Sequence, residues 1–269
     1  MKKVVTIAGS DATGGAGIEA DLKTFEEYGA YGMAAITLFD TMDSDDEWAH
    51  HLFPVEEAVL RAQMHTIFKG VGVDAVKTGM LGTQYAVETA AEYIREYQIV
   101  NYVFDPVMVY KGTEELLDPS LIRTALDTLL PLSIMITPNL FEAAQIAEMN
   151  TPTTIEEMKT SALRIYDKGA KNVFIKGGSK LEGHSSAFDL FYNGKEFFNV
   201  EGALIDTHWT HGAGCTISAA IAAGLAQGLD PYEAVSLAKK FITLSFRGSF
   251  QLNQWVGPGN PSLWRKGFN

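Results

Sequence analysis

The sequence HGAGCT at residues 211–216 is followed directly by ISAAIAAGL at residues 217–225. The second stretch has the length and the composition of a buried helix, so the glycines before it are expected at the helix N-terminus. A helix start carries unpaired N–H groups and a partial positive charge, which together bind anions. Gly212 and Gly214 let the backbone approach such an anion closely. The stretch therefore predicts an anion site at the start of a buried helix.

Cys215, the only cysteine of the chain, lies at this predicted helix start. A helix N-terminus lowers the pKa of a thiol and favours the reactive thiolate. A structural cysteine, buried where the helix start is packed, is the alternative. The Gly-x-Gly motif directly before Cys215 favours the functional interpretation.

The composition limits the class of protein. The chain has 269 residues, of which 46% are hydrophobic and 20% charged, and no Pro-, Gly- or Ser-rich linker divides it, so we expect a single domain over residues 1–269. A net charge of −12 argues against nucleic acid or an anionic membrane as a partner. The longest apolar run, residues 217–229, is too short to cross a bilayer. One cysteine and no room for a signal peptide favour the cytoplasm.

Apolar, β-branched runs alternate with helical patterns along most of the chain. Strands are expected at residues 4–8, 33–39, 73–77, 102–104, 134–136, 173–175, 188–192 and 200–206, and a last helix at 234–246. The acidic residues 40–48 predict a solvated loop, and Asn193-Gly194 predicts a two-residue hairpin turn. The alternation indicates parallel βαβ units, and thus a three-layer α/β/α fold with a mostly parallel sheet.

Several polar residues and glycines follow strands or begin helices in this pattern. They are Asp11, Gly79, Asp105, Asn139, Lys176 and Cys215. The carboxyl ends of parallel strands lie along one edge of a sheet, where ligands bind, so we expect these residues around one crevice. Asp11 and Asn139 also suit a purely structural role as helix or turn caps, and both interpretations stay open.

Six stretches together resemble the ribokinase-like superfamily, and most closely its branch of hydroxymethylpyrimidine (phosphate) kinases and related pyridoxal/pyridoxine kinases. They are AGSDATGGAGIEADLKTF (8–25), VKTGMLG (76–82), DPVMVYKG (105–112), TPNLFEA (137–143), IKGG (175–178) and THGAGCT (210–216). The likeness extends from about residue 2 to residue 257. TPNLFEA and HGAGCT in this order are its specific part, whereas the N-terminal glycines alone are not.

The resemblance implies ATP- and Mg²⁺-dependent phosphoryl transfer to a hydroxymethyl group on a heteroaromatic ring, by positioning and charge neutralisation. It implies an anion hole at Gly212, Ala213 and Gly214, with Cys215 as the base where most of the superfamily has Asp. The implied ATP-binding residues are Asn139, Lys176, Gly177, Gly178, Phe188, Ala213 and Lys239. The implied Mg²⁺ residues are Glu142 and, through water, Asp105. The implied acceptor-binding residues are Asp11, Met80, Val107, Tyr110 and His211. A homodimer is expected.

Two features distinguish the branches. Met42 stands where the pyrimidine kinases usually have a Gln, and a thioether cannot supply the paired donor and acceptor of an amide. The loop Lys111-Gly112 also resembles the pyridoxal kinases, so we expect a vitamin B6 substrate. Tyr110 stands where those kinases often carry a second cysteine, so a two-thiol mechanism is not implied. A hydroxymethylpyrimidine kinase of thiamine synthesis, and a nucleotide- or vitamin-binding module without turnover, are the alternatives.

Overall fold

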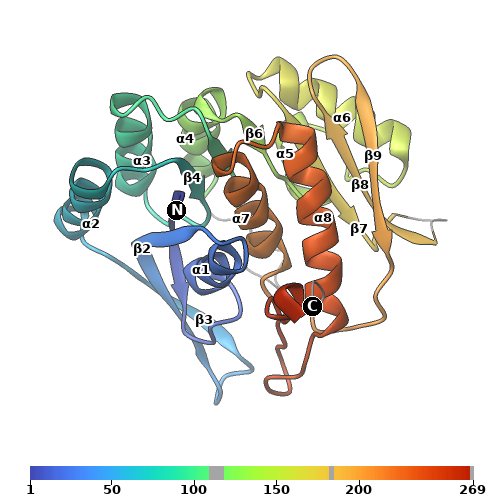
Figure 1. Ribbon diagram of the computed structural model, residues 1–269, viewed down its shortest axis with the longest axis horizontal. Coiled ribbons are helices and arrows are strands. Elements are labelled where there is room, and N and C mark those ends of the chain that lie inside the picture. Colours follow the sequence, from blue (N-terminus) through green and yellow to red (C-terminus); the bar gives the residue numbers. More distant parts are fainter. Residues whose placement is uncertain (109–117, 182–184, 267–269) are drawn as a thin grey trace.

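The computed structural model describes residues 1–108, 118–181 and 185–266. Within them one sheet has the strand order β3-β2-β1-β4-β5-β6-β7-β8-β9 (Figure 1). The strands are β1 (Lys3–Asp11), β2 (Tyr31–Asp43), β3 (Ala49–Pro54), β4 (Ala75–Thr78), β5 (Tyr102–Phe104), β6 (Met135–Ile136), β7 (Val173–Gly178), β8 (Ser186–Tyr192) and β9 (Phe197–Ala203). Strands β2, β1, β4, β5, β6 and β7 pair in parallel, while β3, β8 and β9 are antiparallel to their neighbours.

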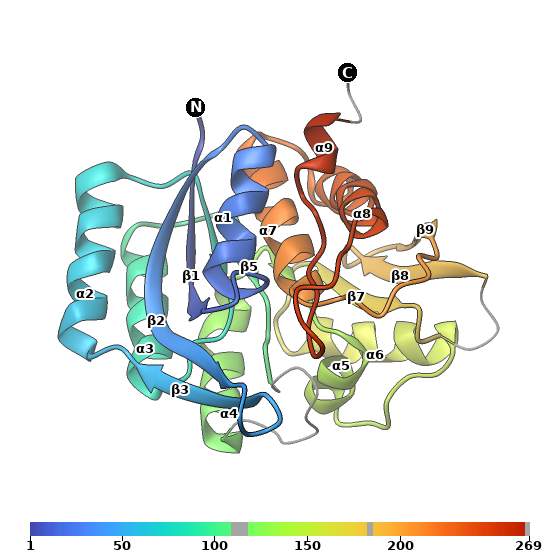
Figure 2. The same cartoon turned by 90° about the horizontal axis from the view of Figure 1, so that it is seen from below.

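Helices cover both faces of the sheet (Figure 2). One face carries α1 (Gly17–Glu27), α7 (Ala213–Ala226), α8 (Pro231–Arg247) and α9 (Leu263–Lys266). The other carries α2 (Glu57–His65), α3 (Gln84–Glu96), α4 (Pro119–Leu129), α5 (Leu140–Ala147) and α6 (Ile155–Asp167). Along β1, Val4 packs in the first core and Val5 in the second, because alternate side chains of a doubly covered strand are both buried. The predicted three-layer α/β/α fold is confirmed.

Helix α7 occupies the middle of its layer and is buried from Thr216 to Ala226. It packs against α1, α8 and β4. A helix that is apolar all round has no face for solvent, which explains why its sequence is almost entirely small and apolar. The predicted buried helix is therefore confirmed, with Gly212 as the residue before its first turn. No helix of the described chain is long and apolar enough to cross a membrane.

Three local predictions are wrong. Residues 40–48 are not all loop, because β2 continues to Asp43 and pairs with the unpredicted edge strand β3. This hairpin is mostly exposed, so it has no apolar alternation to mark it. The turn at Asn193-Gly194 spans four residues, since Tyr192 pairs with Phe197, and the Asn193 side chain closes it on the N–H groups of Lys195 and Glu196. A further short helix, α9, follows the helix predicted to be the last.

Candidate active site

The start of α7 is built to stay open. Gly212 has a left-handed φ of +74°, and a Cβ there would lie 1.9 Å from the carbonyl oxygen of Gly15, so only glycine fits. No side chain of the described residues caps the helix, and its first N–H, that of Ala213, bonds instead to the backbone carbonyl of Thr210 at 3.3 Å. The ammonium of Lys176 lies 3.4 Å from the position of a Cβ on Gly214. A helix N-terminus and a lysine thus face the same space, which is an arrangement for an anion.

Cys215 lies in the first turn of α7 and is half-buried. Burial raises the pKa of its thiol to about 11, and the charge of Lys77 and the N–H of Gly17 lower it too little to compensate. The carboxylates Asp21 and Asp105 raise it further. The expectation of a lowered thiol pKa is therefore wrong for the protein without ligands, because burial and the two carboxylates outweigh Lys77 and the Gly17 N–H.

Asp105 connects the end of β5 to β7 and α7. Its Oδ1 accepts hydrogen bonds from Lys176 Nζ at 2.9 Å and Thr137 Oγ1 at 3.0 Å. Its Oδ2 accepts one from Ser218 Oγ at 3.1 Å. Ser218 lies one turn along α7 from Cys215. Asp105 therefore links Lys176 to the helix that carries the thiol. Sequence reasoning missed Ser218, which looks like one more small residue of a buried helix.

The start of α5 is closed by its own side chains. Asn139 Oδ1 accepts from the Glu142 N–H at 2.9 Å, and Glu142 Oε2 accepts from the Asn139 N–H at 2.7 Å. Asn139 therefore caps α5, which is one of the two roles that the sequence allows for it. Glu142 is buried, and burial raises its pKa to about 7, with Lys176 lowering it and Asp105 raising it.

The donor set suits Mg²⁺. Kinase sites usually hold this ion by one or two carboxylates, together with waters and substrate phosphates. Asp105 and Glu142 are carboxylates, and they lie close enough for the charge of Asp105 to raise the pKa of Glu142. A cation there would relieve that repulsion. In the described part of the chain no three His, Cys, Asp or Glu side chains form a group that could hold a metal.

Asp11 and His211, two hundred residues apart, meet on the other side of the α7 start. His211 Nε2 lies 2.5 Å from Asp11 Oδ2, and the Thr13 N–H and Oγ1 bind Asp11 Oδ1, each at 2.7 Å. Burial would raise the pKa of Asp11, but the hydrogen bonds from His211 and Thr13 overcome it and lower the pKa. His211 Nδ1 is buried without a partner among the described residues. That nitrogen can bind a polar group of a ligand.

On the β7–β8 side, Asp189 links two of the predicted nucleotide-binding residues. Its Oδ1 accepts from the Gly178 N–H at 2.9 Å, and its Oδ2 from Lys239 Nζ at 2.7 Å. Lys239 also lines a groove between β9 and α8 that includes Lys240 and Arg247. Sequence analysis missed Asp189, although an acid inside the apolar run Phe188-Asp189-Leu190 was a usable signal. Phe188 itself is fully buried in the core.

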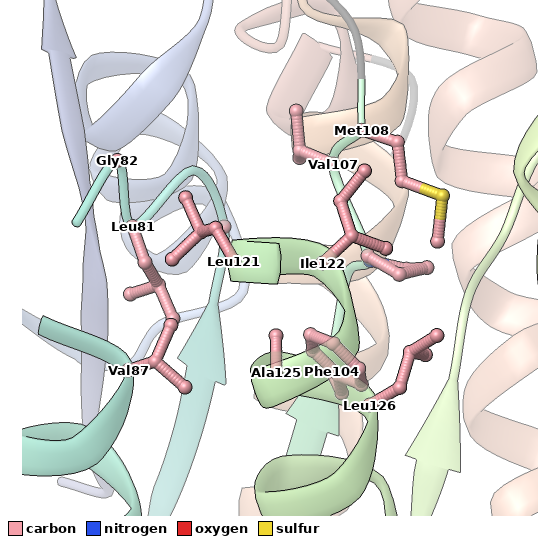
Figure 3. Close-up of a pocket in the computed structure, with 12 residues that line it drawn as sticks. Leu81, Gly82, Val87, Phe104, Val107, Met108, Leu121, Ile122, Ala125 and Leu126 are labelled. Carbon is pink, nitrogen blue, oxygen red and sulfur yellow. The ribbon is translucent and has the colours of Figure 1, made fainter. Parts of the chain in front are cut away.

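Val107 lines a small apolar pocket, with a cavity volume of about 30 Å³, at the ends of β4 and β5, beneath α4 (Figure 3). Leu121, Ile122 and Leu126 of α4 form one wall (Figure 3). Asp11 and His211 are not part of its lining, so the pocket alone offers little to orient a polar ring. Met80 is half-buried, and its carbonyl accepts from Thr37 Oγ1 at 2.8 Å. Tyr110, and with it the loop expected to cover the substrate, lies outside the described residues.

The structure thus brings Asp105, Lys176, Gly214, Cys215 and Glu142 to one place, with the Asp11–His211 pair on the adjoining side. It also reveals a buried ion pair that sequence reasoning missed, Lys77 with Asp21, at 2.8 Å. A lysine inside the apolar strand Ala75-Val76-Lys77-Thr78 was the available signal.

Comparison with known proteins gives a consistent result. The family model described as phosphomethylpyrimidine kinase matches residues 11–260. A pyridoxine kinase of Bacillus subtilis is 49% identical, over 98% of this chain and 97% of its own. The hydroxymethylpyrimidine/phosphomethylpyrimidine kinase of the same organism is 36% identical, over 98% and 96%.

Solved structures agree with these relatives. An ADP complex of Bacillus subtilis pyridoxal kinase superimposes with a TM-score of 0.95 at 49% identity, covering 98% of this chain and 99% of the other. The pyridoxal kinase of Staphylococcus aureus in complex with AMP-PCP and pyridoxal gives a TM-score of 0.92 at 41% identity, covering 99% and 95%. The pyrimidine kinase is thus the more distant of the two kinds of relative.

Proposed function

Because this chain belongs to the phosphomethylpyrimidine kinase family, we propose that it is an ATP-dependent kinase of the 5′-hydroxymethyl group of pyridoxine, pyridoxal or pyridoxamine. It is an alcohol phosphotransferase, as its relatives are. One observation in the site carries the proposal. The uncapped start of α7 lies beside Lys176 and the Asp11–His211 pair, so a transferring phosphoryl group would sit between a nucleotide side and an acceptor side.

The nucleotide side uses the glycines and lysines of β7 and α8. Lys176, Gly177 and Gly178 hold the ATP phosphates, with Lys176 already anchored by Asp105. Lys239 and Ala213 contact the nucleotide, and Asn139 contributes from the start of α5. Phe188 supports this side from within the core, where its carbonyl lies 2.5 Å from the position of a Cβ on Gly177. That close approach requires glycine at position 177.

Glu142 and Asp105 hold Mg²⁺ in this proposal, Asp105 through water because three donors already occupy its oxygens. The bound ion neutralises phosphate charge. The protein supplies the geometry, because α5, β5 and β7 fix the two carboxylates and Lys176 relative to the α7 start.

The acceptor side positions the ring and removes a proton. Asp11 orients His211 by the bond at Nε2, and the unpartnered Nδ1 binds a polar group of the ring. Met80 and Val107 contact the ring face, and Tyr110 is expected to close over it. Cys215 takes the proton of the hydroxymethyl group as its oxygen attacks the γ-phosphorus. It must be a thiolate at that moment.

The setting of the enzyme rests on composition. A single cysteine suits a reducing compartment, and we place the enzyme in the cytoplasm, as one domain per chain and a homodimer. Analytical ultracentrifugation of the purified protein measures the oligomeric state, and a monomer at micromolar concentration would contradict the dimer.

The deciding experiment is an ADP-release assay with pyridoxal, pyridoxine and hydroxymethylpyrimidine. Met42 leaves the pyrimidine amino group without a partner, which costs about 1–3 kcal/mol, so we expect a higher kcat/KM for the B6 vitamers. The Met42→Gln variant should narrow the difference. Equal or better use of the pyrimidine by the wild type would favour the pyrimidine kinase. Binding without ADP formation would favour a module without turnover.

A further inference from the structure

A buried ion pair lies beneath the candidate active site. Lys77 on β4 and Asp21 on α1 are both completely inaccessible to solvent, and Lys77 Nζ lies 2.8 Å from Asp21 Oδ2. Thr6 Oγ1 donates to the same oxygen at 2.6 Å. Asp21 Oδ1 has no partner within the described part of the chain. The pair is therefore incompletely satisfied, on a core strand where an apolar residue would fit.

Stability does not explain such a pair. Removing two charges from water costs several kcal/mol for each ion, and well-packed apolar residues often replace a buried ion pair without loss of stability. The unpartnered oxygen adds to that cost. A buried lysine held this way is a candidate for a role in the chemistry.

The ammonium points toward the reacting edge of the sheet. Lys77 Nζ lies 2.9 Å from the position of a Cβ on Gly79, just beyond the carboxyl end of β4. There the Asp105 N–H bonds to the Thr78 carbonyl at 3.1 Å. Helix α7 packs against both α1 and β4, so the two elements that supply the ion pair also contact the helix that carries Cys215.

Charges reach the thiol from four elements. Lys77 on β4 lowers the pKa of Cys215, whereas Asp21 on α1 and Asp105 after β5 raise it. The fourth group is Lys176 on β7, whose own pKa is raised partly by Cys215. Burial lowers the pKa of Lys77, but Asp21, Cys215 and Asp105 together raise it. The ammonium of Lys77 therefore stays charged in the core.

We propose that Lys77, held by Asp21, is a positioning residue for phosphoryl transfer whose ammonium stabilises the thiolate form of Cys215. The inference rests on the proposed role of Cys215 as the base. The thiol first releases its proton to solvent. The thiolate then takes the hydroxyl proton while the oxygen–phosphorus bond forms and the bond from the γ-phosphorus to ADP breaks. The products are the phosphate ester, ADP and the neutral thiol.

Removing one or the other charge of the pair should shift the pKa of the Cys215 thiol in opposite directions. Replacing Lys77 by Met removes a positive charge, so the thiol should ionise at higher pH. Replacing Asp21 by Asn removes a negative charge, so the thiol should ionise at lower pH. A nearby charge shifts a pKa by about 1–3 units. Damage to the fold alone would not move the thiol in opposite directions.

The test is the rate of iodoacetamide alkylation as a function of pH, on the full chain without ligands. Cys215 is the only cysteine, so the reaction reports on it alone. We expect the midpoint of the pH profile to rise by about one unit or more in Lys77→Met, to fall in Asp21→Asn, and to stay nearly unchanged in Lys77→Arg. Lys168→Met, which breaks the exposed pair with Glu148, is the matched control and should not shift it.

If Lys77→Met fails to fold, Asp21→Asn still decides, because it removes the negative charge of the pair and leaves the Lys77 side chain in place. An unchanged midpoint in folded Lys77→Met or in Asp21→Asn, or a rise in Asp21→Asn, would overturn the proposal. The assay does not require turnover. The midpoints of the Lys77 and Asp21 variants could shift as expected while Cys215→Ala keeps full activity. That pair of results would refute Cys215 as the base and leave the electrostatic coupling of Lys77 to the thiol intact.

Discussion

The two helices that begin at the candidate site start in opposite ways. Helix α5 is closed by a capping box, in which Asn139 and Glu142 satisfy each other's backbone N–H groups. Helix α7 starts at Gly212, whose left-handed backbone carries no side chain and which leaves the helix uncapped. The difference lies in one residue, an asparagine or a glycine at the position before the helix. This difference gives the two helix starts different roles. The open start of α7 can accept an anion, and the closed start of α5 presents a carboxylate.

The charges beside each start fit this division. Lys176 faces the open start of α7, and the only acidic group of its first turn is a thiol that burial keeps neutral. At α5 burial raises the pKa of Glu142 to about 7. The start of α7 therefore has a positive group but no negative charge, and the start of α5 holds a buried carboxylate whose pKa Lys176 lowers too little to offset burial. A phosphate at α7 and Mg²⁺ at α5 would balance these charges.

The strongest way to break the comparison is to close α7. Gly212→Ala would place a Cβ 1.9 Å from the Gly15 carbonyl oxygen on a backbone with φ of +74°. Gly228→Ala is the matched control, because Gly228 has φ of +96° and, its chain neighbours aside, no described residue places an atom within 4 Å of its Cβ position. We expect no measurable phosphoryl transfer in the first, and a loss of about 1–2 kcal/mol in stability with activity retained in the second. ADP release measures phosphoryl transfer and urea unfolding measures stability in each variant. Similar activity in the two variants would contradict an open helix start that needs Gly212.

Removing the thiol from the open start tests its chemistry. A positioned base contributes about 10²–10⁴-fold, so Cys215→Ala should lower kcat by that factor while nucleotide still binds at the intact helix start. Cys215→Asp should keep part of the rate, because a carboxylate can accept the proton. Steady-state kinetics together with calorimetry of ATP binding separate the two effects. A near wild-type kcat in Cys215→Ala would make Cys215 a structural residue.

The position of the α7 start could be predicted from the sequence, whereas the pKa of the thiol at that start could not. The apolar stretch 217–225 marks a buried helix by composition, and Gly-x-Gly before it marks a backbone that needs freedom, so both features are local. The thiol pKa depends on burial and on Lys77, Asp21 and Asp105, which come from other strands and helices. Residue spacing carries no information on such contacts. The edge strand β3 was missed for a related reason, because its residues pack too little to be apolar.

The closed start of α5 predicts a dependence of stability on pH in the metal-free protein. The folded-state pKa of Glu142 is about 7, against an ordinary value of 4.5. The folded state therefore favours the protonated acid, and its stabilisation is complete below pH 4.5 and lost as pH rises to 7. The difference is about 3 kcal/mol. Urea unfolding of wild type and Glu142→Gln at pH 4.5 and pH 8 should show the wild type losing this amount relative to the variant.

Mg²⁺ should partly restore the wild type at pH 8, because it favours the ionised carboxylate. It should stabilise Glu142→Gln less. Parallel pH profiles of the two proteins would mean that burial does not raise the pKa of Glu142 in the folded protein.

The smallest expected effect separates the cap of α5 from its function. Thr154 and Glu157 form the same kind of capping box at the start of α6, which carries none of the proposed site residues. Asn139→Ala and Thr154→Ala should each lose about 1 kcal/mol of unfolding free energy, the usual cost of removing a cap. Only Asn139→Ala should also raise KM for ATP, because only that cap holds Glu142 beside Asp105 and Lys176. Equal KM values in the two variants, measured at equal folded fraction, would show that the α5 capping box is structural alone, and the contrast between the two helix starts would then reduce to the anion site of α7.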